Sequence, residues 1–208
     1  MYIPPAFRDD DRASLHDAIR SVRLASLVTA SSDGLMASPL PMFLDDQEGE
    51  WGTLYAHVAR ANPQWQRQPI GEAMAIFMGD DAYITPSWYA TKRETGKVVP
   101  TWNYIAVHAY GTLEFFDDRD RLHDIVDRLT NLHETKRAAP WSISDAPADY
   151  MAAQLKGIVG VRLAITRLEG KRKMSQNRPA ADRAGVIAGL SESASHIDQG
   201  VARLIPKA

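Results

Sequence analysis

Three short segments of this 208-residue chain combine charged, aromatic and amide side chains closely enough to bind a ligand. The first segment runs from His57 to Pro63 and follows a stretch that is typical of a strand. His57, Arg60 and Asn62 are spaced so that they can converge on one side of a turn. A guanidinium group beside the free N–H groups of a helix start is well suited to phosphate. The alternative interpretation is a solvated loop that carries a single arginine.

The second segment, from Val98 to Tyr104, places Trp102 and Tyr104 between side chains that form hydrogen bonds. A flat, amphipathic ligand such as a flavin suits this pattern, because the rings can stack while Thr101 and Asn103 contact polar edges. The alternative is that the two aromatic rings close one end of a barrel.

The third segment runs from Gly170 to Arg178 and combines cations with neutral polar groups. The polar groups suit a phosphate or the polar edge of a ring, whereas the charges alone indicate either a solvated face or a patch that binds DNA. No helix-turn-helix pattern surrounds them. The residues concerned are Lys171, Arg172, Lys173, Ser175, Gln176, Asn177 and Arg178.

The composition excludes several kinds of protein. The chain has no cysteine, so disulfides, thiolate zinc sites, iron–sulfur clusters and a cysteine nucleophile are excluded. No two of the six histidines have the i, i+4 spacing of a helical metal site, and we expect no metal. The net charge of −2 does not by itself favour a polyanion. The longest apolar run, Ala73 to Met78, is far shorter than the ~20 residues that span a bilayer, and no signal peptide is visible, so we expect a cytoplasmic protein.

The hydrophobic pattern predicts a mainly β fold with peripheral helices. Alternation and turn residues predict strands at 24–30, 35–44, 52–57, 72–78, 82–85, 104–116 and 159–165, with a turn at 79–81. Helical spacing predicts helices at 15–22, 122–132, 148–156 and 182–191, and another near residue 197. Since helices do not alternate with the strands, we expect a closed antiparallel barrel.

Pro39 and Pro41 lie inside the second predicted strand. Proline cannot donate to a sheet ladder, so one edge of this strand must be unpaired or face something other than a strand. The 86–100 segment carries loop signals only. The change to a basic, polar character after Gly170 predicts a first domain at 1–170 and a basic, helical extension at 171–208, which would pack on the barrel or on a dimer partner.

Three strings, Tyr83-Ile-Thr-Pro-Ser-Trp-Tyr89, Val99-Pro-Thr-Trp-Asn-Tyr104 and Lys173-Met-Ser-Gln-Asn-Arg178, together resemble the PaiB-type family of FMN-binding negative transcriptional regulators. The resemblance covers nearly the whole chain. It implies an antiparallel six-stranded split β-barrel, similar to pyridoxamine-phosphate oxidase, that forms a homodimer and holds FMN between its subunits.

The resemblance also implies where FMN would bind. The strand under the flavin would contain Ser38, Leu40 and Pro41, and the phosphate would lie against His57, Val58, Arg60 and Asn62. The remaining wall would be formed by Trp102, Asn103, Lys173, Ser175 and Gln176.

The function that follows from the resemblance is an FMN-binding regulator that represses transcription. If it contacts DNA, the patch would consist of Lys171, Arg172, Lys173 and Arg178 of both subunits. The alternative is an enzyme: a flavin-dependent oxidoreductase, whose chemistry needs no catalytic motif of the protein, or a haem-handling barrel with His57, His108 or His133 as axial ligand. A third interpretation is a dimeric scaffold without a ligand.

Overall fold

The computed structural model describes residues 1–207. Its strands are β1 (Arg8–Asp9), β2 (Leu24–Ser31), β3 (Gly34–Pro41), β4 (Phe43–Asp45), β5 (Thr53–Ala59), β6 (Ala73–Ile84), β7 (Thr101–Phe116) and β8 (Ile158–Lys173). The α-helices are α1 (Arg12–Val22), α2 (Ala90–Thr95), α3 (Arg119–Glu134), α4 (Ala148–Lys156), α5 (Ala180–Ser191) and α6 (His196–Leu204). Short 3-10 helices are η1 (Pro5–Phe7), η2 (Pro63–Gln66), η3 (Pro86–Trp88) and η4 (Ile143–Asp145).

Within residues 1–207 the strands form one eight-stranded sheet in the order β3-β2-β6-β7-β8-β5-β4, with β1 paired to β8. The pairs β1–β8, β2–β3, β2–β6, β4–β5 and β5–β8 are antiparallel. Two strands, β1 and β4, have only two and three residues, so six strands of substantial length remain. The predicted mainly β, antiparallel fold with peripheral helices is confirmed.

The two prolines lie in β3, which ends the sheet order. β3 pairs with β2 in a register that opposes Ser26 to Pro39 and Leu24 to Pro41. The turn between the two strands contains Gly34, whose φ of 103° suits only a residue without Cβ. The sequence therefore predicted this edge correctly, because proline has no N–H to offer a further strand.

The predicted turn at 79–81 is wrong, because β6 runs without interruption from Ala73 to Ile84. A Cβ at Gly79 would lie 3.2 Å from Cβ of Ile105, so this glycine allows β7 to approach closely. A Cβ at Gly200 would likewise lie 2.7 Å from Oδ2 of Asp80. Tertiary packing, and not a chain reversal, explains the Gly-Asp-Asp string.

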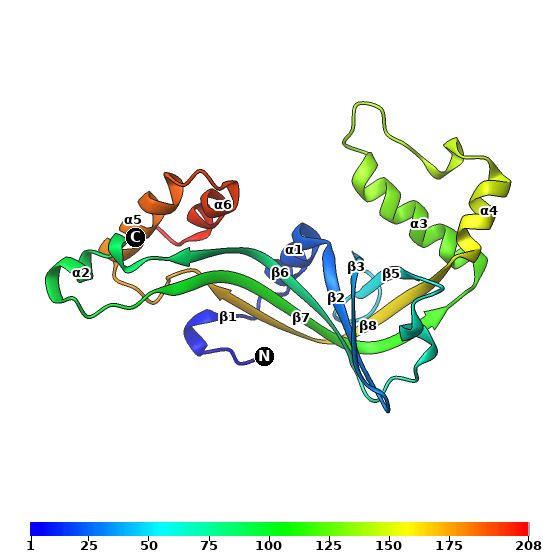
Figure 1. Ribbon diagram of the computed structural model, residues 1–208, viewed down its shortest axis with the longest axis horizontal. Coiled ribbons are helices and arrows are strands. Elements are labelled where there is room, and N and C mark those ends of the chain that lie inside the picture. Colours follow the sequence, from blue (N-terminus) through cyan, green and yellow to red (C-terminus); the bar gives the residue numbers. More distant parts are fainter. Residues whose placement is uncertain (208) are drawn as a thin grey trace. The chain divides into compact units, whose positions relative to one another are not determined.

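Contacts divide the chain into two compact units, each described by itself. Unit 1 comprises 1–18, 78–107 and 169–208, and unit 2 comprises 19–77 and 108–168. The strands β6, β7 and β8 each contribute residues to both units (Figure 1). Residues 171–207 belong to unit 1, and β8 continues through residue 170. The predicted domain boundary at residue 170 stays a prediction.

The core of unit 2 lies where α3 and α4 cover part of the sheet. Phe43, Phe116, Leu122, Ile125, Leu129 and Leu155 form one buried cluster. Asp118 is the N-cap of α3, and its carboxylate accepts a hydrogen bond from the Arg121 N–H. A Cβ at Gly160 would lie 2.4 Å from the Phe116 ring, so β8 uses glycine to let that ring enter the core.

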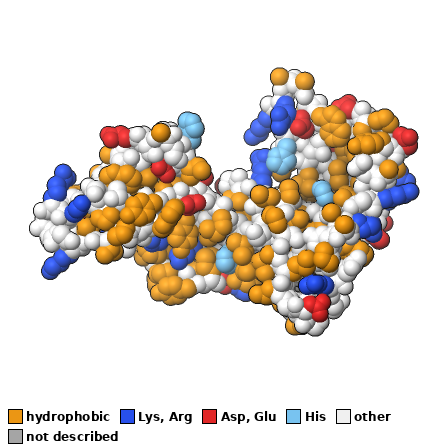
Figure 2. Space-filling model, in the orientation of Figure 1, with side chains coloured by type: hydrophobic (Ala, Val, Ile, Leu, Met, Phe, Trp, Pro, Cys, Tyr) orange, Lys and Arg blue, Asp and Glu red, His pale blue; other side chains and the backbone are white. Residues whose placement is uncertain are grey.

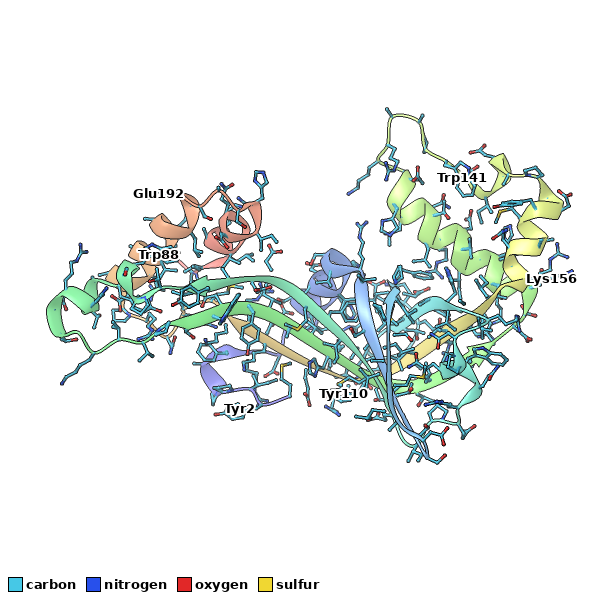
Figure 3. The ribbon with its side chains drawn as sticks, in the orientation of Figure 1. Tyr2, Trp88, Tyr110, Trp141, Lys156 and Glu192 are labelled. Atoms are coloured by element: carbon cyan, nitrogen blue, oxygen red, sulfur yellow. The ribbon has the colours of Figure 1, made fainter. Side chains whose placement is uncertain are left out.

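In unit 1 the 86–100 segment packs against the C-terminal helices. Trp88 lies against α5, where a Cβ at Gly185 would be 2.0 Å from the Trp88 carbonyl oxygen and one at Gly189 would be 2.2 Å from its ring (Figure 3). The Thr91 N–H and hydroxyl each donate to the buried Asp182 carboxylate at 2.9 Å. The segment that the sequence described only as a loop thus contains η3 and α2, and α5 holds both in place.

Candidate functional site

The residues expected to bind FMN fall into both units. Unit 2 contains Ser38, Leu40, Pro41, His57, Val58, Arg60 and Asn62, whereas unit 1 contains Trp102, Asn103, Lys173, Ser175 and Gln176. The two groups are therefore described separately.

In unit 2, Ser38 and Asn62 are joined directly. Asn62 Nδ2 donates to Ser38 Oγ at 2.9 Å, and Asn62 Oδ1 accepts from the Gln64 N–H at 2.9 Å, which caps η2. The sequence analysis missed Gln64, which is fully buried and whose Nε2 donates to Thr29 Oγ1 at 3.0 Å and to the Leu27 carbonyl at 3.2 Å. Asn62 thus fixes η2 against β3, and Gln64 fixes it against β2.

Arg60 makes several contacts with its own unit. Its Nε donates to the Lys156 carbonyl at 2.7 Å and its NH2 to the Ile158 carbonyl at 3.0 Å. NH1 lies 3.7 Å from the exposed Asp117 carboxylate. Two of the five N–H donors therefore hold the end of α4 and the start of β8, while NH1 faces a solvated carboxylate that an incoming phosphate could displace.

His57 and Val58 are neighbours on β5 and point to opposite sides of the strand. Val58 is buried in the core, and Nδ1 of His57 is buried without a hydrogen-bond partner among the described residues. Burial lowers the pKa of His57 below its ordinary value, because the low-dielectric surroundings disfavour the imidazolium form. His57 is therefore a neutral imidazole at pH 7.

Of the two apolar residues expected under the flavin, Leu40 is buried and Pro41 is exposed on the outer edge of β3. Ser38, two residues before Leu40, is also buried. Of these three residues, only Pro41 is exposed to solvent in the single chain.

In unit 1, Lys173 at the end of β8 reaches the start of β7. Its ammonium donates to the Trp102 carbonyl at 2.6 Å and to the Thr101 hydroxyl. Burial lowers the pKa of Lys173, and the positive charges of Lys171 and Arg178 lower it further. No carboxylate of the described residues forms an ion pair with this amine, so its charge is available to an anionic ligand.

Asn103 and Ser175 form a buried pair on the other side of β7. Asn103 Nδ2 lies 3.0 Å from Ser175 Oγ, and Ser175 Oγ lies 3.2 Å from Asn103 Oδ1. Ser175 has a φ of 58°, which is rare for a residue with a side chain. Gln176 closes the same turn, because its Oε1 accepts from the Met174 N–H at 2.6 Å and its Nε2 donates to the Arg172 carbonyl. These three side chains shape the turn after β8.

A surface of rings and lysines lies on the opposite side of β7 and β8 from that pair; we call it the aromatic–lysine face. Trp102 and Tyr83 are 51% and 50% exposed and meet edge to face at 6.2 Å between ring centroids. Lys171 Nζ lies 5.2 Å from the Tyr104 ring and 5.8 Å from that of Tyr2, the residue labelled in Figure 3. Hydrophobic side chains reach the surface over much of this unit (Figure 2). Its members are Tyr2, Tyr83, Trp102, Tyr104, Lys171 and Lys173.

The four cations expected to contact DNA do not share one environment. Arg172 points away from Lys171 and Lys173, because successive strand residues face opposite sides, and its Nε lies 3.4 Å from Asp9 Oδ2. Arg178 lies 4.8 Å over the ring of the buried Tyr89. Of the four cations, Arg172 is thus ion-paired, whereas neither lysine forms an ion pair with a carboxylate of residues 1–207.

Two relatives resemble nearly the whole chain. A protein of Aspergillus fumigatus without a described function is 33% identical over 99% of this chain and 96% of its own length. The Bacillus subtilis protein named protease synthase and sporulation protein PAI 2 is 29% identical over 91% of this chain and 89% of its own.

A solved structure shows the same fold. The FAD and haem binding protein of Mycobacterium smegmatis has a TM-score of 0.58 at 16% identity, and the likeness covers 80% of this chain and 73% of that one. The fold is that of the split-barrel flavoproteins. No helix among residues 1–207 is long and apolar enough to cross a membrane. The model of the family described as "Putative FMN-binding domain" matches residues 1–167, and the chain belongs to that family.

Proposed function

We propose that this chain binds FMN and that the isoalloxazine ring lies against the aromatic–lysine face. The observation that carries this proposal is the pairing of the half-exposed Trp102 and Tyr83 rings with Lys173, an amine that forms no ion pair with a carboxylate of the described residues. Flat aromatic ligands gain from such rings, and a nearby cation favours the electron-rich edge of the flavin. Membership of the family supports FMN over other flavins.

Trp102→Ala tests the ring contact. We expect FMN affinity to fall about tenfold, since aromatic stacking contributes about 0.5–1.5 kcal/mol beyond burial of the ring area. Trp141→Ala is the matched control, because Trp141 is 43% exposed and belongs to unit 2. Equal loss of affinity in both variants, measured by quenching of flavin fluorescence, would contradict the placement of the ring.

Two sets of residues remain candidates for the phosphate: Arg60 with Asn62 in unit 2, and Lys171 with Lys173 in unit 1. Comparing FMN with riboflavin isolates the phosphate contribution. Removal of the true phosphate ligand, by Arg60→Ala or by Lys171→Ala, should weaken FMN binding and leave riboflavin binding unchanged. Lys97→Ala, an exposed lysine outside the aromatic–lysine face, is the control. If every variant still binds FMN more tightly than riboflavin by the same factor as the wild-type chain, neither set of residues binds the phosphate.

We further propose that two copies assemble as a homodimer in the cytoplasm and repress transcription. The resemblance to the PaiB-type family of negative transcriptional regulators supports a regulatory role, and Lys171 with Lys173 from both subunits would supply the cations that face DNA phosphates. A gel shift with the DNA upstream of the protein's own gene tests this proposal. We expect a salt-sensitive shift that Lys171→Ala/Lys173→Ala abolishes; an unchanged shift in that variant would overturn the assignment.

The second candidate is a flavin-dependent oxidoreductase, favoured by the likeness to a protein that binds FAD and haem. FMN supplies hydride chemistry itself, so the protein needs only to bind and orient it. Anaerobic addition of NADH or NADPH to the FMN complex distinguishes the two candidates. Rapid bleaching of the flavin band would favour the oxidoreductase, and a stable yellow complex favours the regulator.

A further inference from the structure

Unit 2 contains a cavity of about 510 Å³ between α3, η4 and α4 that the proposed FMN function does not use. Small-molecule sites commonly measure about 300–1,000 Å³, so this volume is sufficient for a ligand. All of its lining residues lie between 119 and 155, within one unit. Trp141, labelled in Figure 3, directly precedes the segment 142–144, which forms one wall of the cavity.

The rim of this cavity carries N–H donors from Arg119 and His123. Arg119 and His123 are one helical turn apart on α3 and therefore project to the same side. Neither side chain forms a hydrogen bond or an ion pair with the other residues that the structure describes. Asp127, on the next turn of α3, also lines the cavity, and one oxygen of its carboxylate accepts from Asn131 Nδ2 at 2.9 Å. A guanidinium group and an imidazole thus face the opening with unused N–H donors.

The floor of the cavity is apolar, with Ile143, Met151 and Leu155 lining it. Ile143 and Leu155 are buried, and Leu155 belongs to the hydrophobic cluster under α3. Ser142 and Ser144 line one wall of the cavity with their hydroxyl groups, and their Oγ atoms lie 2.7 Å apart. Since one hydroxyl proton serves the contact between them, the other is free to donate to a ligand.

We propose that this cavity binds a small organic monocarboxylate with an apolar body. The carboxylate accepts hydrogen bonds from Arg119, His123 and the free serine hydroxyl, and the apolar body contacts Met151 and Leu155. A purely apolar ligand leaves the N–H donors of Arg119 and His123 unused, and a purely ionic one leaves the apolar floor in contact with water. Only an amphipathic anion matches both parts.

Titration calorimetry of the full chain with octanoate, and with octan-1-ol as the uncharged analogue, tests this proposal. We expect saturable octanoate binding at least about tenfold tighter than octan-1-ol binding, because hydrogen bonds to charged groups are the stronger ones. Arg119→Ala/His123→Ala should remove this preference. The control Arg93→Ala/His196→Ala changes the same residue types at exposed positions of unit 1 and should leave it intact.

A second pair of variants tests the volume. Ala152 lines the cavity, whereas its neighbour Ala153 is exposed and does not. Ala152→Phe should fill the cavity and abolish octanoate binding, and Ala153→Phe should leave binding unchanged, with circular dichroism confirming that both variants fold. The proposal is overturned if octanoate does not bind at millimolar concentration, if octan-1-ol binds equally well, or if Ala152→Phe and Ala153→Phe bind octanoate alike.

Discussion

Arg60, which is predicted to bind phosphate, holds parts of the fold together. Its guanidinium donates to the carbonyls of Lys156 and Ile158, so it joins the turn after β5 to the start of β8. Arg60→Ala leaves both carbonyls without this charged donor. We expect the free energy of unfolding to fall by about 1.5–3 kcal/mol. Urea denaturation without flavin measures this change, and unaltered stability would mean that water replaces the guanidinium at no cost.

The pH dependence of stability provides a test of His57. The pKa of His57 in the folded chain lies below the ordinary value of 6.5, because burial disfavours its charged form. Well above pH 6.5 the imidazole is neutral in both the folded and the unfolded chain and does not make the free energy of unfolding depend on pH. As the pH falls below 6.5, the unfolded chain binds a proton that the folded chain does not, so the free energy of unfolding decreases.

His57→Gln removes this proton uptake, and we expect its loss of stability between pH 6.5 and 5 to be smaller than that of the wild-type chain. His196→Gln, at an exposed histidine, serves as the control and should follow the wild-type curve. Denaturation curves at half-unit steps of pH give the measurement. Parallel curves for His57→Gln and the wild type would show that His57 is readily protonated in the folded chain.

At the residue level the sequence identified the right segments but not all of their partners. Lys173 and Trp102 are in contact, and so are Asn103 and Ser175, although about 70 residues separate the members of each pair. The pattern of aromatic and amide residues revealed each segment, whereas strand pairing alone decides which segment meets which. Gln64 was missed because a polar residue after Asn-Pro in a turn gives no sign of burial.

Among the elements, the strands and helices were mostly predictable because burial imposes their periods of 2 and 3.6 residues. Glycine was the main source of error. Gly79 resembles a turn residue but allows Ile105 to approach. A Cβ added at Gly111 would likewise lie 2.1 Å from the Ala164 carbonyl oxygen. Sequence shows that a glycine is present and cannot show whether it serves a turn or a close contact.

The packing of η3 on α5 gives a prediction at the same level. A Cβ at Gly185 would clash with the Trp88 carbonyl oxygen, a backbone atom that cannot move aside easily. Gly185→Ala should separate η3 and α2 from α5 and cost about 1–3 kcal/mol of stability. Limited proteolysis should then cut within 89–100 much faster than in the wild-type chain. Ala184→Leu adds more bulk on the exposed side of the same helix and should leave the cleavage rate unchanged.

For the whole molecule, the fold class followed from the absence of helices between most strands, and the match of the family model over residues 1–167 agrees with the resemblance carried by three short strings. Those strings meet in unit 1, where most of their polar side chains bind one another. The strings that carry the resemblance therefore build one local structure in this chain. Whether the chain regulates transcription or transfers electrons depends on partners that no strand pattern encodes.

The central claim is that this chain binds FMN. Equilibrium dialysis of the purified chain against FMN, with bound flavin determined from its absorbance, tests it most directly. We predict saturable binding that approaches one FMN per chain and that Trp102→Ala weakens while Trp141→Ala does not. An equal flavin concentration on both sides of the dialysis membrane at every concentration tested would mean that the chain does not bind FMN and would contradict the account.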